Sequence, residues 1–106
     1  MAARRRRVEW TARALTALDD ALAYIAVDSP AAAERLLVSI LDAAASLSEL
    51  TERGRIVPEL EEPSVRELII PPYRLVYEYD ESHVWVLTLL HTAQEFQLRR
   101  RDVSEG

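Results

Sequence analysis

Few side chains in this sequence could do chemistry, and most of them lie in its last third. They are two arginines, two tyrosines, a histidine and two neighbouring polar residues: Arg66, Arg74, Tyr73, Tyr77, His91, Gln94 and Glu95. An arginine stays charged at every accessible pH and suits the binding of an anion, whereas a histidine can transfer protons near neutral pH. The set is therefore compatible with an anion-binding surface or with a small acid–base site.

Arg74 is the most informative of these residues because it lies in a run otherwise made of Tyr, Leu and Val. A guanidinium in such a strand needs an acid or water on its side of the sheet. A cross-strand ion pair with Glu67 or Glu78 is one interpretation, and contact with an external anion is the other. His91 also has two interpretations, a hydrogen bond to the neighbouring turn or catalytic proton transfer.

The composition excludes several kinds of site. Without cysteine there is no disulfide or thiolate ligand, and the separate His83 and His91 make a poor zinc site, so we expect no metal and no cofactor. Two glycines, Gly54 and Gly106, cannot form a phosphate-cradling loop. The longest stretch without a charged residue, 82–94, is too short to span a membrane, and no apolar segment follows the first arginines. We therefore expect a cytoplasmic protein.

The net charge of −5 is unevenly distributed along the 106 residues. Residues 1–7 hold four arginines and no acid, 8–98 hold six arginines against sixteen acids, and 99–106 hold three arginines against two acids. We expect a single domain over residues 1–106, with a basic N-terminal tail at 1–7 and a C-terminal tail or short helix at 97–106. The acidic body disfavours binding of a polyanion, whereas the basic ends are either solvated tails or contacts for a partner.

Hydrophobic periodicity predicts two helices in the first half of the chain. A short strand at 8–10 leads into a helix capped by Thr11, with apolar residues three and four apart as far as Val27. Ser29 as N-cap and Pro30 at the first helical position start a second helix. Its apolar seam packs along the first helix and consists of Ala33, Leu37, Ile40, Ala44 and Leu47.

After a connection at 51–63 that we interpret as a loop, the period changes to that of strands. Three strands are predicted, at 64–70, 73–79 and 83–91, in an antiparallel meander. The fold class is therefore α+β, in the order β-α-α-β-β-β, with a helical hairpin packed on a small antiparallel sheet.

A turn at 80–83 sets the expected register of the last two strands. Arg74 then faces Leu89, Glu78 faces Trp85, and His91 lies on this same face of the sheet. The two helices should cover the opposite face, which carries Tyr73, Leu75, Tyr77, Val84, Val86 and Leu90.

Six short segments between residues 8 and 96 follow one another in a recognisable order. They are Val8-Glu9-Trp10-Thr11, Ser29-Pro30-Ala31-Ala32-Ala33, Gly54-Arg55-Ile56-Val57-Pro58-Glu59, Val65-Arg66-Glu67-Leu68, Pro72-Tyr73-Arg74-Leu75-Val76-Tyr77 and Leu89-Leu90-His91. With this order and spacing the chain resembles the RelE/ParE superfamily of toxins from bacterial type II toxin–antitoxin modules, and more closely its ParE branch. The resemblance implies the fold predicted above.

The resemblance also implies partners. Such a toxin is neutralised by a cognate antitoxin of the ParD or RelB type, whose disordered segment folds as it wraps the toxin. It would meet operator DNA only through the antitoxin complex, and it would have no membrane partner. The candidate antitoxin-binding residues are Leu15, Leu22, Leu36, Leu41 and Trp85.

The intracellular target divides the superfamily. The RelE-like branch cleaves mRNA at the ribosome with several basic side chains that stabilise the charged transition state. Arg74 matches one of those positions, but Val65 and Glu67 stand where that branch has catalytic lysines, and Gln94 stands where it has another arginine. A nuclease would have to use Arg74 with His91 or Tyr73, which disfavours this activity.

The ParE-like branch instead poisons DNA gyrase and needs no nuclease site of its own. We therefore expect a gyrase inhibitor, with a ribosome-dependent mRNA endonuclease and a non-toxic interaction module of the same fold as alternatives. The candidate target-binding residues are Arg66, Arg74, His91, Gln94, Glu95, Arg99, Arg100 and Arg101.

Overall fold

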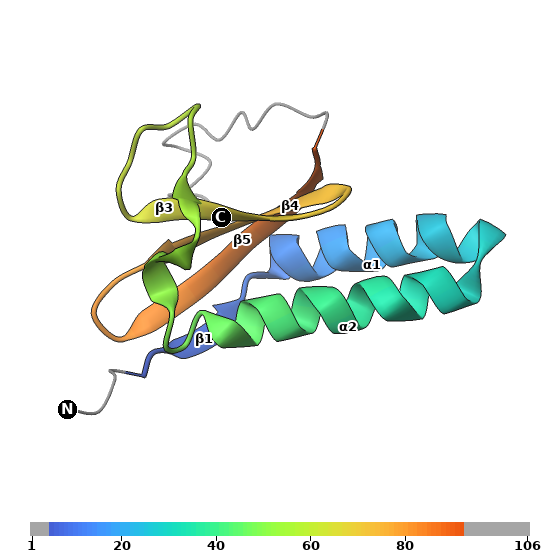
Figure 1. The fold of residues 1–106 in the computed structure, drawn as a ribbon, viewed down its shortest axis with the longest axis horizontal. Helices are drawn as coiled ribbons and strands as arrows, with labels where there is room; N and C mark the ends of the chain where they lie inside the picture. Colours follow the sequence, from blue (N-terminus) through green and yellow to red (C-terminus); the bar gives the residue numbers. More distant parts are fainter. Residues whose placement is uncertain (1–4, 93–106) are drawn as a thin grey trace.

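The computed structural model describes residues 5–92, which form a helical hairpin packed on a five-stranded sheet (Figure 1). In chain order the elements are β1 (Arg7–Trp10), α1 (Ala12–Asp28), α2 (Pro30–Ser46), the 3-10 turn η1 (Thr51–Arg53), β2 (Arg55–Ile56), β3 (Val65–Ile70), β4 (Tyr73–Tyr79) and β5 (His83–His91). The predicted fold class and order are confirmed. The prediction of an uninterrupted loop at 51–63 is wrong, because this stretch contains η1 and β2. The basic tail predicted at 1–7 extends too far, because Arg7 begins β1 and Arg6 donates to the Asp80 carbonyl and the Thr51 hydroxyl. Residues 1–4 and the tail predicted at 97–106 lie outside the described residues.

Both predicted helix starts are confirmed by their capping hydrogen bonds. The Thr11 hydroxyl accepts a hydrogen bond from the Ala14 N–H at 3.1 Å, and the Ser29 hydroxyl accepts one from the Ala32 N–H at 3.1 Å. Pro30 is the first residue of α2, where its missing N–H leaves no carbonyl unpaired. Ser29 thus ends α1 and begins α2, which makes the hairpin turn very short.

The strand order of the sheet is β1-β5-β4-β3-β2, and the sheet is mixed. The last three strands form the predicted antiparallel meander, and β2 adds to β3 in antiparallel direction. β1 pairs with β5 in parallel direction, from Arg7 opposite His83 to Trp10 opposite Val86. This pairing joins the two ends of the described chain, so no local turn could have indicated it.

The register of β4 and β5 changes part-way along the pair. Near the turn Glu78 faces Trp85, as predicted. A β-bulge follows, because Tyr77 faces Val86 while Val76 faces Thr88. The extra residue shifts everything beyond it by one position.

The prediction that Arg74 faces Leu89 is therefore wrong, since Arg74 faces Leu90. The bulge also exchanges the two faces of β5: Leu89, rather than Leu90, belongs to the core under the helices. His91 faces Tyr73 and so does not share a face with Arg74, which corrects a second part of the predicted register.

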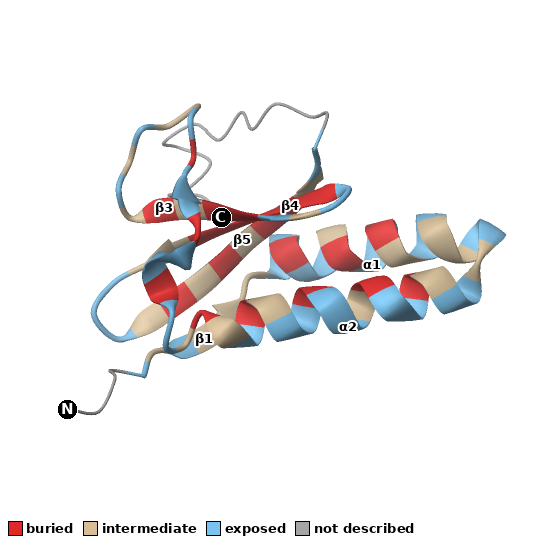
Figure 2. Cartoon of the chain, in the orientation of Figure 1, coloured by how far each residue is buried: buried red, intermediate tan, exposed pale blue. Residues whose placement is uncertain are grey.

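The two faces of the sheet carry different cores. The helices cover the larger one, in which buried side chains of α1 and α2 meet Leu75, Tyr77 and Val86 (Figure 2). A smaller apolar cluster on the opposite face is built from Val57, Val65, Val76, Leu60, Leu87 and Leu90. Because Val57 and Leu60 precede β3, the connection between β2 and β3 folds over this second face (Figure 1).

A buried tyrosine joins η1 to the sheet. The Tyr77 hydroxyl donates to the Thr51 carbonyl at 2.6 Å and accepts from the Gly54 N–H at 3.0 Å, and burial raises the pKa of the phenol. A Cβ atom at Gly54 would lie 2.6 Å from this hydroxyl and 2.7 Å from the Glu67 carbonyl oxygen. Close approach, rather than an unusual backbone angle, therefore requires glycine at this position.

We expect Gly54→Ala to lower the free energy of unfolding by about 1–3 kcal/mol, because the methyl group must displace a buried hydroxyl and a backbone carbonyl. Urea denaturation measures this change. Tyr77→Phe should also destabilise, and the double variant should lose less than the sum of the two changes, because both act on one contact. An unchanged stability of Gly54→Ala would contradict the close approach.

Candidate functional site

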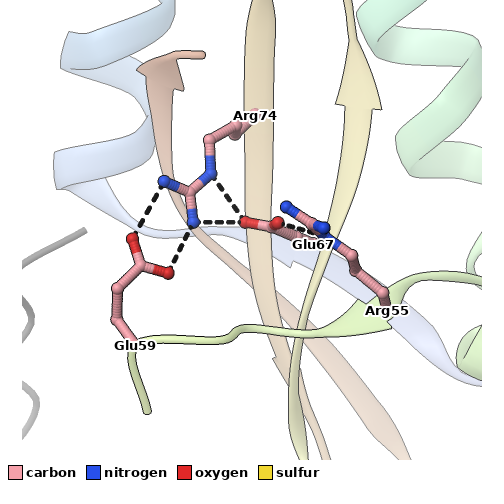
Figure 3. A network of polar contacts seen from close by, with 4 residues as sticks. All are labelled: Arg55, Glu59, Glu67 and Arg74. Atoms are coloured by element: carbon pink, nitrogen blue, oxygen red, sulfur yellow. Dashed lines mark hydrogen bonds and ion pairs between the residues drawn. The ribbon is translucent and has the colours of Figure 1, made fainter. Parts of the chain in front are cut away.

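Arg74 points from β4 onto the face of the sheet opposite the helices, where it contacts Glu59 and Glu67, and Arg55 contacts Glu67 in turn (Figure 3). Glu67 comes from β3, Arg55 from β2, and Glu59 from the connection that folds over this face. The Glu67 side chain is fully buried, and that of Arg74 is 7% exposed. We call these four residues the Arg74 network.

In the Arg74 network, each oxygen of the two carboxylates accepts a hydrogen bond from an arginine. Arg74 donates through Nη1 and Nη2 to the two oxygens of Glu59, each at 3.0 Å. Its Nε donates to Glu67 Oε1 at 2.7 Å, and Arg55 Nε donates to the other Glu67 oxygen at 2.5 Å. The geometry is the two-pronged one in which arginine binds a carboxylate most strongly.

Two cations and two anions make the Arg74 network neutral overall. The hydrogen bonds that Arg74 donates to Glu59 raise the pKa of its guanidinium most, burial opposes them, and Glu67 adds to the increase. The predicted cross-strand ion pair between Arg74 and Glu67 is thus confirmed. Glu59 was not anticipated, because it reaches Arg74 from a connection whose path no strand register predicts. The network fastens this connection to the sheet.

The proposed nuclease residues lie on different sides of the sheet. Tyr73 is buried in the core under the helices, and its ring contacts that of His91 edge to face, with the centroids 5.8 Å apart. Arg74 faces the other side, where it contacts Glu59 and Glu67. The structure therefore brings Tyr73 and His91 together but separates both from Arg74.

Arg66 binds backbone rather than presenting a free cation. Its guanidinium donates to the carbonyls of Pro63, Glu52 and Gly54 at 3.0, 3.2 and 3.1 Å. Its charge also lies 5.9 Å from the centre of the Tyr79 ring. The remaining predicted target-binding residues lie outside the described residues: Gln94, Glu95, Arg99, Arg100 and Arg101.

The predicted antitoxin-binding leucines differ in exposure. Leu15 and Leu41 are 50% and 45% exposed, whereas Leu22 packs against the core and Leu36 is buried within it. Val38, which the sequence prediction omitted, is 53% exposed on α2. The remaining candidate, Trp85, lies on β5 and stacks on His83 with the ring centroids 5.3 Å apart. Tyr24 and Val27 near the end of α1 are exposed as well, so the hairpin carries several exposed apolar side chains. Both helices have an exposed side that faces away from the sheet (Figure 2).

Within residues 5–92, no group of three or more His, Cys, Asp or Glu side chains is placed to hold a metal ion. No helix in the same range is long and apolar enough to cross a membrane.

Comparison with known proteins gives the family. The model of the ParE toxin of the type II toxin–antitoxin system, parDE, matches residues 8–96. The chain belongs to this family. Toxin RelE2 of Caulobacter vibrioides is 38% identical over 89 residues, which cover 83% of this chain and 97% of that protein. This ParE-family chain is therefore a type II toxin of the ParE/RelE group.

Solved structures agree with the fold. A chain of the chromosomal ParDE system from P. aeruginosa matches with a TM-score of 0.67 and 21% identity, covering 84% of this ParE-family chain and 98% of its own length. A chain of the RelBE2 toxin–antitoxin complex from Mycobacterium tuberculosis matches with a TM-score of 0.60 and 22% identity, covering 82% and 98%. The helical hairpin on a mixed sheet is thus the ParE/RelE toxin fold.

In this ParE-family toxin we expect Arg74→Ala to lower the free energy of unfolding by about 3–5 kcal/mol, because it leaves Glu67 buried with only a peripheral partner. Arg55→Ala should cost about 1 kcal/mol or less, because the Arg55 side chain is 61% exposed. Urea denaturation of both variants, with Arg74→Lys as an intermediate case, measures the contrast. Equal losses for the two alanine variants would contradict a network centred on Arg74.

Glu78 carries a charge that the fold disfavours. Burial raises the pKa of this carboxyl above its ordinary 4.5, and the neighbouring Glu62 and Asp80 raise it further. The folded protein therefore binds the Glu78 proton more tightly than the unfolded chain does, so that this residue costs stability as the pH rises through the folded pKa.

We expect Glu78→Gln to be more stable than the unchanged protein at pH 7. The advantage should shrink as the pH falls through the raised pKa towards 4.5, because both side chains are then neutral. Urea denaturation of both proteins at a series of pH values measures the difference. A constant difference across this range would show that the charge of Glu78 is not its cause.

Proposed function

We propose that this toxin is neutralised by a cognate antitoxin and acts on DNA gyrase by protein–protein binding rather than by cleaving RNA. The Arg74 network is the observation that supports binding of a protein target rather than cleavage of RNA. The one basic side chain that matches the RNA-cleaving branch is 7% exposed and bound to two carboxylates. Its charge is neutralised within the fold.

Catalysis of RNA cleavage needs cations that remain available when negative charge develops on the phosphate. In the Arg74 network each nearby cation already has a carboxylate partner. Opening the network would leave Glu67 buried beside an incoming polyanion, which adds repulsion to the cost of desolvation. Tyr73 and His91 could not compensate, because they lie on the opposite face.

Exposed apolar side chains on the hairpin, among them Leu15, Val38 and Leu41, support an antitoxin partner. Leu15, Val38 and Leu41 project from α1 and α2, and none is needed to fill the core. A ParD- or RelB-like antitoxin segment that folds on binding would cover them and bury apolar surface on both chains. The structural relatives come from a ParDE system and a RelBE2 complex, which agrees with this partner. We place operator DNA contact in the antitoxin complex and the toxin in the cytoplasm.

The gyrase contact is proposed for the stretch from His91 to Arg101. His91 is exposed at the end of β5 and marks where the described chain approaches this stretch. Arg99, Arg100 and Arg101 follow within it and would supply positive charge that the acidic body lacks. Residues engaged within the fold, Arg66 and Arg74, are left out of the proposed contact.

We expect purified toxin to block supercoiling of relaxed plasmid by DNA gyrase and to leave mRNA on translating ribosomes intact. Gel electrophoresis of the plasmid and primer extension on the mRNA measure the two results. Added antitoxin should restore supercoiling. Unaffected supercoiling at excess toxin would reject the gyrase target, and cuts in the mRNA that Arg74→Ala abolishes would establish the ribosome-dependent endonuclease instead.

Charge reversal separates the proposed gyrase contact from general electrostatics. Changing Arg99, Arg100 and Arg101 to Glu should weaken the inhibition of gyrase at least tenfold. The growth arrest that the toxin causes in cells should weaken in parallel. The matched control reverses Arg4, Arg5 and Arg7, which changes the net charge equally. It spares Arg6, which donates to the Asp80 carbonyl and the Thr51 hydroxyl, and within residues 5–92 it breaks only the exposed ion pairs of Arg5 with Glu49 and of Arg7 with Glu9. Equal loss in both variants would mean that net charge alone is responsible. Cell growth unaffected by the unchanged toxin would indicate an interaction module without toxicity.

A further inference from the structure

Two adjoining hollows lie along α2. The first, of about 300 Å³, is bounded by Ile25 of α1, Leu36 of α2 and the turn formed by Ile70, Pro71 and Pro72. The second, of about 510 Å³, lies along the outer side of α2 beside Ala31, Glu34 and Val38. Arg35 and Ser39 line both hollows. We call the combined depression the α2 groove.

Arg35 differs from most other arginines of the described chain. Arg6, Arg53, Arg55, Arg66 and Arg74 all donate hydrogen bonds to carbonyls, hydroxyls or carboxylates. Arg35 is exposed, and within residues 5–92 it makes no hydrogen bond or ion pair. Among the residues that the structure describes, it is also the sole charged side chain that lines the first hollow. An available guanidinium thus stands beside an apolar depression.

This combination favours one kind of occupant. The apolar walls of the first hollow suit an aliphatic or aromatic side chain, and the Arg35 guanidinium suits a carboxylate next to it. Glu34 lines the second hollow and repels an acid there, so the acid of the occupant is confined to the side of Pro71 and Pro72. The charges around the α2 groove therefore favour an acidic side chain on the occupant and also determine where along the groove it lies.

We propose that the α2 groove binds a segment of the antitoxin in which an apolar anchor enters the first hollow and a neighbouring Asp or Glu pairs with Arg35. This inference rests on the proposed antitoxin partner. Because the rest of the domain is acidic, an acidic side chain of the antitoxin is repelled over most of the toxin surface and attracted at Arg35. Arg35 thereby sets the register of the bound segment and discriminates against antitoxins that carry a basic residue at that point.

Charge reversal at Arg35 tests the proposed ion pair. The probe is the purified antitoxin encoded by the reading frame beside the toxin gene, and calorimetry measures its affinity at low and at raised salt. Arg35→Glu should weaken binding about 10- to 100-fold and reduce the dependence on salt. Arg13→Glu is the matched control, because Arg13 is also exposed and without an ion pair in the described chain but lines neither hollow. It should change the affinity less than threefold.

Filling the hollow tests the apolar anchor independently of charge. Ser39→Trp should weaken binding at least tenfold, because Ser39 lines both hollows and an indole would occupy the groove. Both variants should unfold at the same temperature as the unchanged toxin, since Arg35 and Ser39 are exposed. An antitoxin changed from Asp or Glu to Arg at one position should bind Arg35→Glu more tightly than the original antitoxin does.

The outcomes distinguish this inference from the proposal beneath it. If the antitoxin fails to bind the unchanged toxin, the antitoxin partner itself is rejected. If it binds the unchanged toxin and binds Arg35→Glu and Ser39→Trp equally well, the partner stands and the α2 groove is rejected. A loss shared equally by Arg13→Glu and Arg35→Glu would also reject it, because the effect would then come from net charge.

Discussion

The buried carboxylate of Glu67 is the constraint around which one whole face of the sheet is organised. A charge without solvent access must be paired and fully hydrogen-bonded, or the fold does not persist. Arg74 and Arg55 meet this requirement from the strands on either side of β3, and Glu59 supplies the second negative charge that balances the two arginines. Because Glu59 belongs to the connection between β2 and β3, its bonds hold that connection over the smaller apolar cluster. Arg74, which the sequence resemblance matches to a cation of the RNA-cleaving branch, is part of this framework.

The two faces of the sheet consequently have different roles. The helix-covered face contains the main core and the Tyr77 hydroxyl that joins η1 to the sheet. The opposite face is closed by the Arg74 network instead of by a helix. Within residues 5–92, the outside of the hairpin and the end of β5 remain exposed to partners. This division agrees with a toxin that acts by binding other proteins.

Local patterns predicted the helix caps, the three long strands and the turn at Asp80, because each depends on residues close together in sequence. Thr11 and Ser29 cap the two helices and Pro30 is the first residue of α2, as their side-chain chemistry predicted. The β-bulge in β5 was not predictable in this way. In Val-Trp-Val-Leu-Thr-Leu-Leu every residue except the threonine is apolar, so the pattern does not show which residues face the helices. The single extra residue of the bulge decided the faces of Leu89, Leu90 and His91. Glu59 was missed for a related reason: its partner depends on the path of an irregular connection.

The parallel pairing of β1 with β5 has a consequence for when this toxin can first exist as a folded molecule. β1 forms early in synthesis, but its hydrogen-bonding partner is the last strand of the described chain. Contacts between such distant segments cannot form until β5 has been synthesised, and they form slowly. An interrupted translation product therefore lacks the strand that joins β1 to the meander. Chains that end before His83 cannot complete this sheet, because the backbone of β1 is left without its partner strand.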